Sequence, residues 1–549
     1  MGVTLVAVLA LLLLTPSAFR AIVTGLRQKN VAEGEVLQVL GNDRVRARFV
    51  VKVEATDLVA VMLAGGVRYG VAVRIVQGAS SADVDLHLLP ISDLPATLVA
   101  PASLRDGTAQ VVAMPEGLHR PLGVITENTD VLAIAYRPFP GQEQAVGDIV
   151  AAHVGEREVY YQIQNASISI ESTVGSDKGE FIQVAAAQLG VWDADRQIFD
   201  REGWVPDPNS SVRKPIAFPA ANPQMGEVAL GNIPGTEFLV SMDYREAITH
   251  HTAVLGVTGV GKSVFVRELI RNVPIEAAKF ICVDITGEYI TRVPGSVSLV
   301  TDAERGQIAG WIEEIYREKV KFANQQNPQL IDQRERSIRD LFGQKINAFI
   351  AGNDQSAVLE MADLDGTLQN YEYLKWFFRA AFLVAKSRPQ PALPLLSLVL
   401  EEAHTIVPEW NFLGDSDRSA GTVVNSISQV ALQGRKYGVG LIVVGQRTAN
   451  ISKTVLTQCN TVICFQQFDR TSFEFLNSFM GGEAESILPN LKLRTAVAAG
   501  KAIRSTAPLV FRVPDVAVGP LANAGGEAPA GGGGGDNGAA IPPELQGLV

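Results

Sequence analysis

A glycine-rich segment with the sequence GVTGVGKS, residues 256–263, constrains this chain more than any other feature. It fits the pattern G-x-x-x-x-G-K-[ST], follows the strand-like run TAVLGV and opens the helix-like run VFVRELIRNV, which is the context of a phosphate-binding loop. Backbone N–H groups of such a loop surround phosphate oxygens, Lys262 supplies a cation for the β and γ phosphates, and the Ser263 hydroxyl binds magnesium. The segment therefore predicts a site for ATP and Mg²⁺. The predicted nucleotide-binding residues are Gly256, Thr258, Gly259, Val260, Gly261, Lys262 and Ser263, of which Ser263 is also a predicted metal ligand.

Two consecutive acids end a strongly apolar run, LLSLVLEE at residues 395–402. An apolar strand that ends in two acids is the Walker B pattern of nucleotide hydrolases. We expect Glu401 to hold the magnesium hydration shell and Glu402 to polarise the attacking water as a general base. Either acid alone would also suit a charge at a helix N-terminus. The pair after a buried strand favours the catalytic interpretation.

Other candidate catalytic residues follow strand-like runs. Asp284 ends the run KFICVD, and it is expected to contact magnesium or its waters, with a plain strand-end turn as the alternative. Gln446 ends the run LIVVGQ, where a γ-phosphate sensor usually sits. A ring ATPase also needs a cation from the neighbouring subunit to stabilise transition-state charge, and Arg435 or Arg447 is the candidate.

The pattern of apolar runs indicates the fold class. Short β-rich stretches before residue 170 predict one small barrel or a pair of them, and the later alternation of strand-like and helix-like runs predicts an α/β domain. The predicted fold is an α/β RecA-like P-loop ATPase core with a mostly parallel sheet, an N-terminal all-β barrel region and a helical insertion. The expected divisions are an apolar segment (1–20), a β-rich region (21–170), a connector (171–224), the ATPase domain (225–515) with the helical insertion (302–387), and a disordered Gly/Ala-rich tail (516–549).

Five blocks of this sequence together resemble the HerA family of the HerA/FtsK superfamily. The blocks are VLGVTGVGKS, VDITGEY, LVLEEAH, GRKYGVGLIVVGQR and VLTQCNT, in the family's order, and the stretch GDIVAAHVGEREVYYQIQ resembles the HAS-barrel that precedes the motor in that family. The chain departs from the family in its extra β-rich portion before residue 115, in its apolar N-terminus, and in having His250-His251 before the first strand. Adjacent histidines there are more often surface or packing residues, and they receive no catalytic role.

The resemblance implies a homo-hexameric ring that binds ATP between subunits, threads double-stranded DNA through its centre and works with a nuclease or other effector protein. The leading expectation is therefore an ATP-hydrolysing DNA translocase or helicase. One alternative is a nucleotide-controlled ring scaffold that assembles and activates an effector enzyme without substantial translocation, as in antiviral defence. Another is a membrane-associated DNA-transfer ATPase. Candidate DNA contacts are the helical insertion and residues near Arg494, Lys501 and Arg504.

Composition limits the partners and the cellular compartment expected for the protein. The net charge of −11 argues against a surface that binds nucleic acid throughout, but it leaves room for a local basic channel. Three cysteines support neither a disulfide framework nor a zinc site, and they fit a reducing cytoplasmic compartment. The uncharged residues 1–19 fit a signal peptide, a membrane anchor or a start-site artefact, so membrane tethering stays open.

Overall fold

A computed structural model describes residues 33–514 of the chain, apart from residues 41–43, 55–56, 90–93, 96–97, 116–120, 140, 172–178, 216–217, 286–288, 294, 362–366, 391, 410–417 and 481–483. The segment expected as a possible anchor (1–20) and the tail expected to be disordered (516–549) lie outside the described residues. Among the helices that are described, none is both long enough and apolar enough to cross a membrane.

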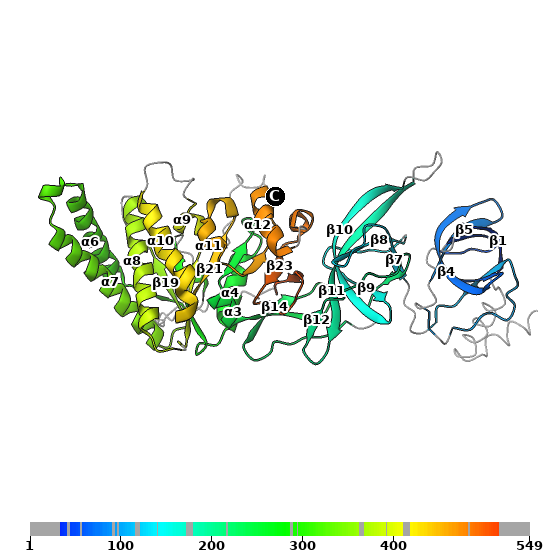
Figure 1. The fold of residues 1–549 in the computed structure, drawn as a ribbon, viewed down its shortest axis with the longest axis horizontal. Helices are drawn as coiled ribbons and strands as arrows, with labels where there is room; N and C mark the ends of the chain where they lie inside the picture. The colour runs from blue at the N-terminus through cyan, green and yellow to red at the C-terminus, as the bar shows by residue number, and fades with distance from the viewer. Residues whose placement is uncertain are drawn as a thin grey trace, which may run out of the picture. The chain divides into compact units, whose positions relative to one another are not determined.

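The first part of the described chain is a closed six-stranded barrel with the strand order β1-β2-β5-β4-β3-β6 (Figure 1). Its strands follow the alternation expected of a barrel wall: in β2 the side chains of Val45, Ala47 and Phe49 are buried in the barrel core, and the arginines between them point outward. The strands are β1 (Glu33–Val39), β2 (Arg44–Phe49), β3 (Leu58–Leu63), β4 (Gly66–Gln77), β5 (Ala82–Leu88) and β6 (Thr108–Val112).

The second part is a seven-stranded sheet with the order β10-β9-β13-β7-β8-β11-β12. Because β10 also pairs with β11, this sheet closes on itself and forms a second barrel. The strands are β7 (Pro121–Ile125), β8 (Ala133–Pro138), β9 (Ile149–Val154), β10 (Arg157–Glu171), β11 (Gly179–Asp193), β12 (Ile198–Asp200) and β13 (Ser211–Arg213). The sequence left open one small barrel or a pair of them, and the structure has a pair.

The second barrel corrects the predicted connector. Residues 171–224 were expected to form a strap, but they contain all of β11, β12 and β13. β11 and β13 are part of the barrel wall, and β12 pairs with β11. Proline and glycine at the strand ends made this segment resemble a loop. Its strands are recognisable only through partners distant in sequence, as in the pairing of Ser211 with Val124.

The third part is an α/β domain, which we call the motor domain after the function expected from the sequence. Its sheet of eleven strands has the order β15-β14-β24-β23-β22-β16-β21-β20-β17-β19-β18. The run from β22 to β18 is parallel, and the strands from β15 to β23 pair antiparallel. The mostly parallel α/β core is thus confirmed. The strands are β14 (Glu227–Asn232), β15 (Leu239–Asp243), β16 (Thr252–Leu255), β17 (Ala278–Asp284), β18 (Val297–Ser298), β19 (Ser356–Glu360), β20 (Leu395–Leu400), β21 (Val439–Gly445), β22 (Thr461–Cys464), β23 (Thr495–Gly500) and β24 (Leu509–Arg512).

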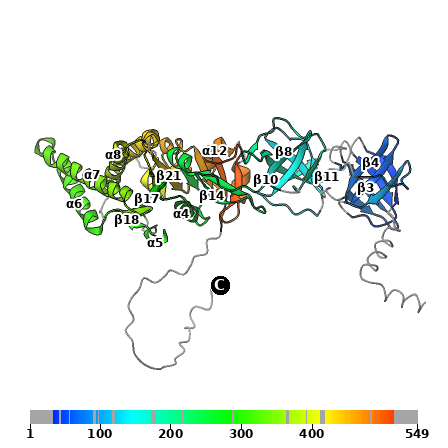
Figure 2. The ribbon, with the colours of Figure 1, turned by 90° about the horizontal axis from the view of Figure 1, so that it is seen from below.

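Helices cover both faces of the motor sheet, as Figure 2 shows for α4 and α8. Alternate residues of β20 divide between the two cores: Leu398 packs with α7, α8 and α10, whereas Val399 packs with α3 and α4. The helices are α3 (Tyr244–Thr249), α4 (Lys262–Asn272), α5 (Tyr289–Arg292), α6 (Asp302–Val320), α7 (Pro328–Ala351), α8 (Thr367–Ser387), α9 (Ala403–Ile406), α10 (Arg418–Gln433), α11 (Lys453–Leu456), α12 (Arg470–Met480) and α13 (Ala484–Ile487), with short 3-10 turns η2 (Ala323–Gln325), η4 (Gly434–Tyr437), η5 (Thr448–Asn450) and η6 (Leu488–Asn490).

The expected helical insertion at 302–387 contains α6, α7 and α8, but it also contains a strand of the central sheet. β19 pairs in parallel with β17 on one side and with β18 on the other. Its five residues are too few to interrupt a helical pattern clearly in the sequence, so the pattern predicts an almost wholly helical insertion. The parallel pairing of Phe280 with Ser356 shows that this region is part of the core sheet.

Candidate active site

The glycine-rich loop connects the carboxyl end of β16 to the first turn of α4. Gly256, Gly259 and Gly261 have φ angles of 151°, 83° and 116°, a region that L side chains rarely adopt. A Cβ atom on Gly256 would lie 2.7 Å from the Cβ of Phe465, so the loop also requires a small residue there. Thr258 and Gly259 are exposed at the surface of the loop. The backbone has the shape that the sequence predicted for a phosphate cradle.

Lys262 is held against this loop. Its side chain is buried, and Nζ donates hydrogen bonds to the carbonyl oxygens of Gly256 at 2.8 Å and Val257 at 2.9 Å. Burial lowers the pKa of the ammonium group, while the nearby carboxylates of Glu402 and Glu401 raise it. The cation is therefore fixed beside the loop, between it and the two acids.

The first of those acids, Glu401, lies at the end of β20 and faces α4. Its Oε1 accepts a hydrogen bond from the Ser263 hydroxyl at 2.9 Å and another from the Tyr289 hydroxyl at 2.7 Å. Burial raises the pKa of this carboxyl, and the two hydroxyl donors lower it. The structure thus brings together the two predicted metal ligands, Ser263 and Glu401. A hydroxyl and a carboxylate are oxygen donors of the kind that Mg²⁺ takes from a protein.

The second acid, Glu402, has a different environment from its neighbour. It adopts a left-handed backbone conformation with φ 46° as the N-cap of α9, which turns its side chain toward β21. Gln446 Nε2 donates to Glu402 Oε1 at 3.0 Å and to Oε2 at 3.2 Å, and His404 Nδ1 lies 3.3 Å from Oε2. Two groups therefore orient this carboxylate, and the predicted sensor is its direct partner. A strained backbone at a non-glycine residue is typical of a functional site.

Asp284 ends β17, and its side chain is buried. Its Oδ2 accepts the backbone N–H of Tyr289 at 2.7 Å, at the first residue of α5. Val283 pairs with Leu400, so Asp284 lies beside the end of β20. Residues 286–288, through which the alternative strand-end turn would pass, lie outside the described residues, so that alternative stays a prediction as well. A contact between Asp284 and magnesium stays a prediction.

Arg435 is not part of this constellation within one protomer. It lies in η4, before the amino end of β21, whereas the phosphate-binding loop follows the carboxyl end of the neighbouring parallel strand β16. The length of β21 separates the two ends by roughly 20 Å. Arg447, the other candidate, is exposed directly after Gln446, at the same edge of the sheet as the loop. Arg435 would reach a nucleotide only from a neighbouring subunit.

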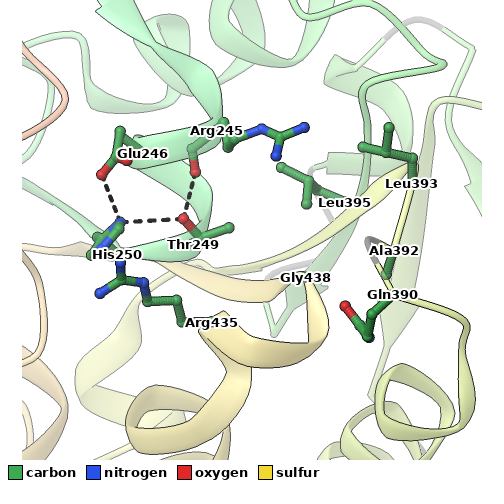
Figure 3. Close-up of a pocket in the computed structure, with 10 residues that line it drawn as sticks. All are labelled: Arg245, Glu246, Thr249, His250, Gln390, Ala392, Leu393, Leu395, Arg435 and Gly438. Carbon is green, nitrogen blue, oxygen red and sulfur yellow. Dashed lines mark hydrogen bonds and ion pairs between the residues drawn. The ribbon is translucent and has the colours of Figure 1, made fainter.

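Arg435 lines a cavity of 220 Å³ at the amino edge of the sheet (Figure 3). Arg245 lines the same cavity, and the His250 ring is held there by Glu246 at 2.8 Å and Thr249 at 3.2 Å. No ion pair or hydrogen bond of the Arg435 side chain is found within the described part of the chain. The Arg435 side chain is exposed.

The other histidine of the pair, His251, is a packing residue. It is buried, its Nδ1 accepts the N–H of Leu441 at 3.0 Å, and its Nε2 lies 2.8 Å from the carbonyl oxygen of Ala431. Because Nδ1 accepts, the proton of the neutral ring is on Nε2, which donates to Ala431. This agrees with the expectation that His251 has a packing role.

The residues proposed from sequence as DNA contacts have other partners. Arg504 forms a largely buried ion pair with Glu227, and Lys501 pairs with Glu246 at 2.8 Å. The backbone N–H of Arg494 donates to the carbonyl of Val260 at 3.1 Å, which places Arg494 beside the phosphate-binding loop. These contacts oppose a DNA-binding role for Lys501 and Arg504, because carboxylates already neutralise them.

Sequence reasoning missed two residues of the site. Tyr289 belongs to the block VDITGEY, and its position five residues after Asp284 could have marked it as a site residue. Gln467 has a fully buried side chain, and its Nε2 donates to the backbone carbonyl of Gln446. No sequence pattern indicated that contact, because it joins the ends of β21 and β22.

Comparison with known proteins gives a family for the motor domain. Residues 228–374 match the family model described as "Helicase HerA, central domain". The chain is 39% identical over 75 residues to the DNA double-strand break repair helicase HerA of Pyrococcus furiosus, which is 14% of this chain and 12% of that protein. It is 21% identical over 356 residues to "Probable helicase MJ1565" of Methanocaldococcus jannaschii, which is 52% of this chain and 67% of that protein. The match thus spans far less than two thirds of the length of the Pyrococcus helicase.

Two solved structures also align with this chain. VirB4 of Thermoanaerobacter pseudethanolicus aligns with a TM-score of 0.35 and 14% identity, over 54% of this chain and 98% of that one. The genome packaging NTPase B204 of Sulfolobus turreted icosahedral virus 2, in complex with ATP-gammaS, aligns with a TM-score of 0.31 and 13% identity, over 48% of this chain and 97% of that one. The family match therefore assigns residues 228–374 to the central domain of HerA-type helicases, the two relatives are distant homologues, and the N-terminal barrels are consistent with a HAS-barrel.

Proposed function

We propose that the motor domain hydrolyses ATP at the carboxyl edge of its parallel sheet. One observation carries this proposal: residues from three separate sequence blocks meet in one site, namely Lys262 and Ser263, Glu401 and Glu402, and Gln446. The hydrogen bond from Ser263 to Glu401 at 2.9 Å and that from Gln446 to Glu402 at 3.0 Å join the blocks.

The phosphate-binding step rests on the loop and on Lys262. Consecutive N–H groups of the loop, at the N-terminus of α4, favour a polyphosphate, and the positive-φ glycines leave the approach to those groups open. Lys262 already lies beside the loop through its bonds to two loop carbonyls. Little side-chain reorganisation is then needed to direct the ammonium group toward phosphate oxygens.

Ser263 and Glu401 fit a magnesium ion. Mg²⁺ is commonly held by one or two protein oxygens together with phosphates and water, and these two side chains lie side by side at the start of α4. Bound there, the ion would neutralise charge that develops on the phosphoryl oxygens. Glu401 would accept hydrogen bonds from water molecules on the metal.

Glu402 is the general base of the proposed reaction. It lies one residue beyond Glu401, but its left-handed backbone directs it to Gln446 and His404. The carboxylate accepts a proton from the attacking water. The Gln446 amide orients the carboxylate by donating to both carboxylate oxygens. Since Gln446 ends the strand beside β16, its amide also suits a sensor of the terminal phosphate.

We further propose that hydrolysis drives movement along double-stranded DNA in a homo-hexamer. The relatives named as helicases support this proposal, as does the placement of Arg435 where only another subunit's nucleotide would meet it. A nuclease or other effector protein is the expected partner. Arg435 then acts in trans on transition-state charge.

A second candidate is a ring scaffold that assembles and activates an effector under nucleotide control. The extra six-stranded barrel favours it, because this barrel is closed and has its own core around Val45, Ala47 and Phe49. A small independent barrel ahead of the motor is suited to docking another protein.

Glu402→Gln tests the proposal. The substitution preserves size and leaves an oxygen for Gln446, but it removes the base, so ATP turnover should fall by about 10²–10⁴-fold while ATP still binds. Glu409→Gln is the matched control, since Glu409 accepts a backbone hydrogen bond from Lys453 at 2.7 Å outside the site. Turnover at the wild-type rate in the Glu402 variant would refute the base assignment.

DNA separates the two candidate functions. ATP turnover of the wild-type chain is measured with and without duplex DNA, and a strand-displacement or triplex-displacement assay follows movement. A motor should hydrolyse faster with duplex DNA and displace the third strand. Hydrolysis without stimulation or displacement would eliminate the motor and favour the scaffold.

A further inference from the structure

We propose that Tyr289 is a positioning residue that holds Glu401 in place for the magnesium ion. The inference rests on the proposed ATPase function and adds a residue to its metal site. Tyr289 is not a catalytic residue in this account, because it acts through Glu401.

The hydroxyl contact carries the proposal. The Tyr289 side chain is only 2% exposed, and its hydroxyl donates to Glu401 Oε1 at 2.7 Å. Ser263 donates to the same oxygen at 2.9 Å. A carboxylate oxygen accepts about two hydrogen bonds, so Oε1 is fully used by protein donors. No described residue donates to Oε2, which is thereby left for a metal-bound water.

The position of Tyr289 is fixed from the neighbouring strand. Its backbone N–H donates to Asp284 Oδ2 at 2.7 Å, and Asp284 ends β17, which pairs in parallel with β20. The ends of the two strands are therefore joined by a chain of contacts from Asp284 through Tyr289 to Glu401. Outer contacts of this type orient a metal ligand and commonly change metal affinity by about 10–100-fold when removed.

An alternative role is simple core packing, since Tyr289 belongs to the apolar cluster on the α4 face of the sheet. Tyr289→Phe separates the two roles, because it retains the ring and removes only the hydroxyl. If the hydroxyl positions Glu401, its loss weakens the response to magnesium. If the ring alone matters, the magnesium response is unchanged.

The experiment measures ATP turnover of the full-length chain as a function of Mg²⁺, and binding of a fluorescent ATP analogue in EDTA. Tyr289→Phe should raise the half-saturating Mg²⁺ concentration about tenfold, and it should leave metal-free nucleotide affinity within about twofold. Tyr373→Phe is the control: Tyr373 is fully buried, and its hydroxyl donates to the Glu360 carbonyl at 3.2 Å, away from the site. The control should keep the wild-type Mg²⁺ response.

A double-mutant cycle with Glu401→Gln tests whether Tyr289 acts through Glu401. The readout is Mg²⁺-dependent binding of a non-hydrolysed ATP analogue, which does not require turnover. Tyr289→Phe should add less than about twofold in the Glu401→Gln background, because the two residues form one unit. An equal effect of Tyr289→Phe in both backgrounds, or none in either, overturns the proposal.

The outcomes also separate this inference from the proposed function. If the wild-type chain binds no Mg²⁺–nucleotide, the ATPase proposal fails and this inference fails with it. If Glu401→Gln weakens magnesium binding and Tyr289→Phe does not, only this inference fails. If Tyr289→Phe does not fold while Tyr373→Phe does, the Tyr289 hydroxyl stabilises the core. That result would also overturn the inference.

Discussion

Substitution of His251 tests the packing at the amino end of β16, the strand that leads into the phosphate-binding loop. The ring bridges two elements: Nδ1 accepts the Leu441 N–H of β21, and Nε2 donates to the Ala431 carbonyl of α10. The residue also has a positive φ of 58°, which Asn tolerates better than most residues. His251→Ala removes both hydrogen bonds, whereas His251→Asn retains an acceptor for the Leu441 N–H.

The expected cost follows from these two contacts. A buried backbone group left without its partner costs about 1–3 kcal/mol, so His251→Ala should lower the free energy of unfolding by about 3 kcal/mol. His251→Asn loses one contact and adopts the left-handed backbone more easily, so it should lose about 1–2 kcal/mol. For a domain of this size, 3 kcal/mol corresponds to a fall in the melting temperature of about 5 °C.

The same residue predicts a pH dependence. Burial lowers the pKa of His251 below its ordinary value of 6.5. Below pH ~6.5 the His251 side chain is protonated in the unfolded chain but stays neutral in the folded protein. The free energy of unfolding is therefore largest above pH ~6.5 and declines as the pH falls below it. His251→Asn lacks this titration. The stability difference between wild type and the Asn variant should therefore shrink as the pH is lowered from 7 toward 5.

Differential scanning calorimetry of the full-length protein measures these effects through the motor-domain transition. His404→Asn is the control, because the His404 side chain is 36% exposed and its replacement should change stability by less than about 0.5 kcal/mol. The reasoning would be refuted if His251→Ala melted within 1 °C of wild type, or if the Asn variant were less stable than the Ala variant.

Two further predictions concern the site. Gly256→Ala should abolish binding of an ATP analogue, because φ is 151° and the new Cβ would lie 2.7 Å from Phe465 Cβ. Gly259→Ala should still bind the analogue measurably, because φ is 83° and no atom lies within 4 Å of the new Cβ. Equal affinities of the two variants would contradict the argument. The Arg435→Ala protein and the Lys262→Ala protein should each be inactive alone. A ring assembled from an equal mixture of the two should regain ATP turnover, because about a quarter of its interfaces join an intact Arg435 to an intact Lys262. No recovery after verified subunit exchange would show that Arg435 does not act across the interface.

Much of the fold could be predicted from local patterns. The buried parallel strands are continuous apolar runs, such as residues 395–400, and the barrel strands alternate, as in β2. The strands within residues 179–213 and the strand β19 have no comparable local pattern. They are recognised as strands only by their pairing with partners distant in sequence. Short strands carry little local signal, and their hydrogen bonds are completed only by the sheet.

The sequence by itself determined which chemistry is predicted for this chain: the phosphate-binding loop, with Lys262 and Ser263, and the acid pair after β20 are local patterns, because each depends on adjacent residues at fixed spacing. Only the tertiary structure decided how that chemistry is arranged. It separated Glu401, which faces Ser263 and Tyr289, from Glu402, which faces Gln446, and it placed Arg435 at the opposite edge of the sheet. These contacts join strand ends that are distant along the chain, and the order and direction of strands in the sheet, which no local pattern encodes, bring them together.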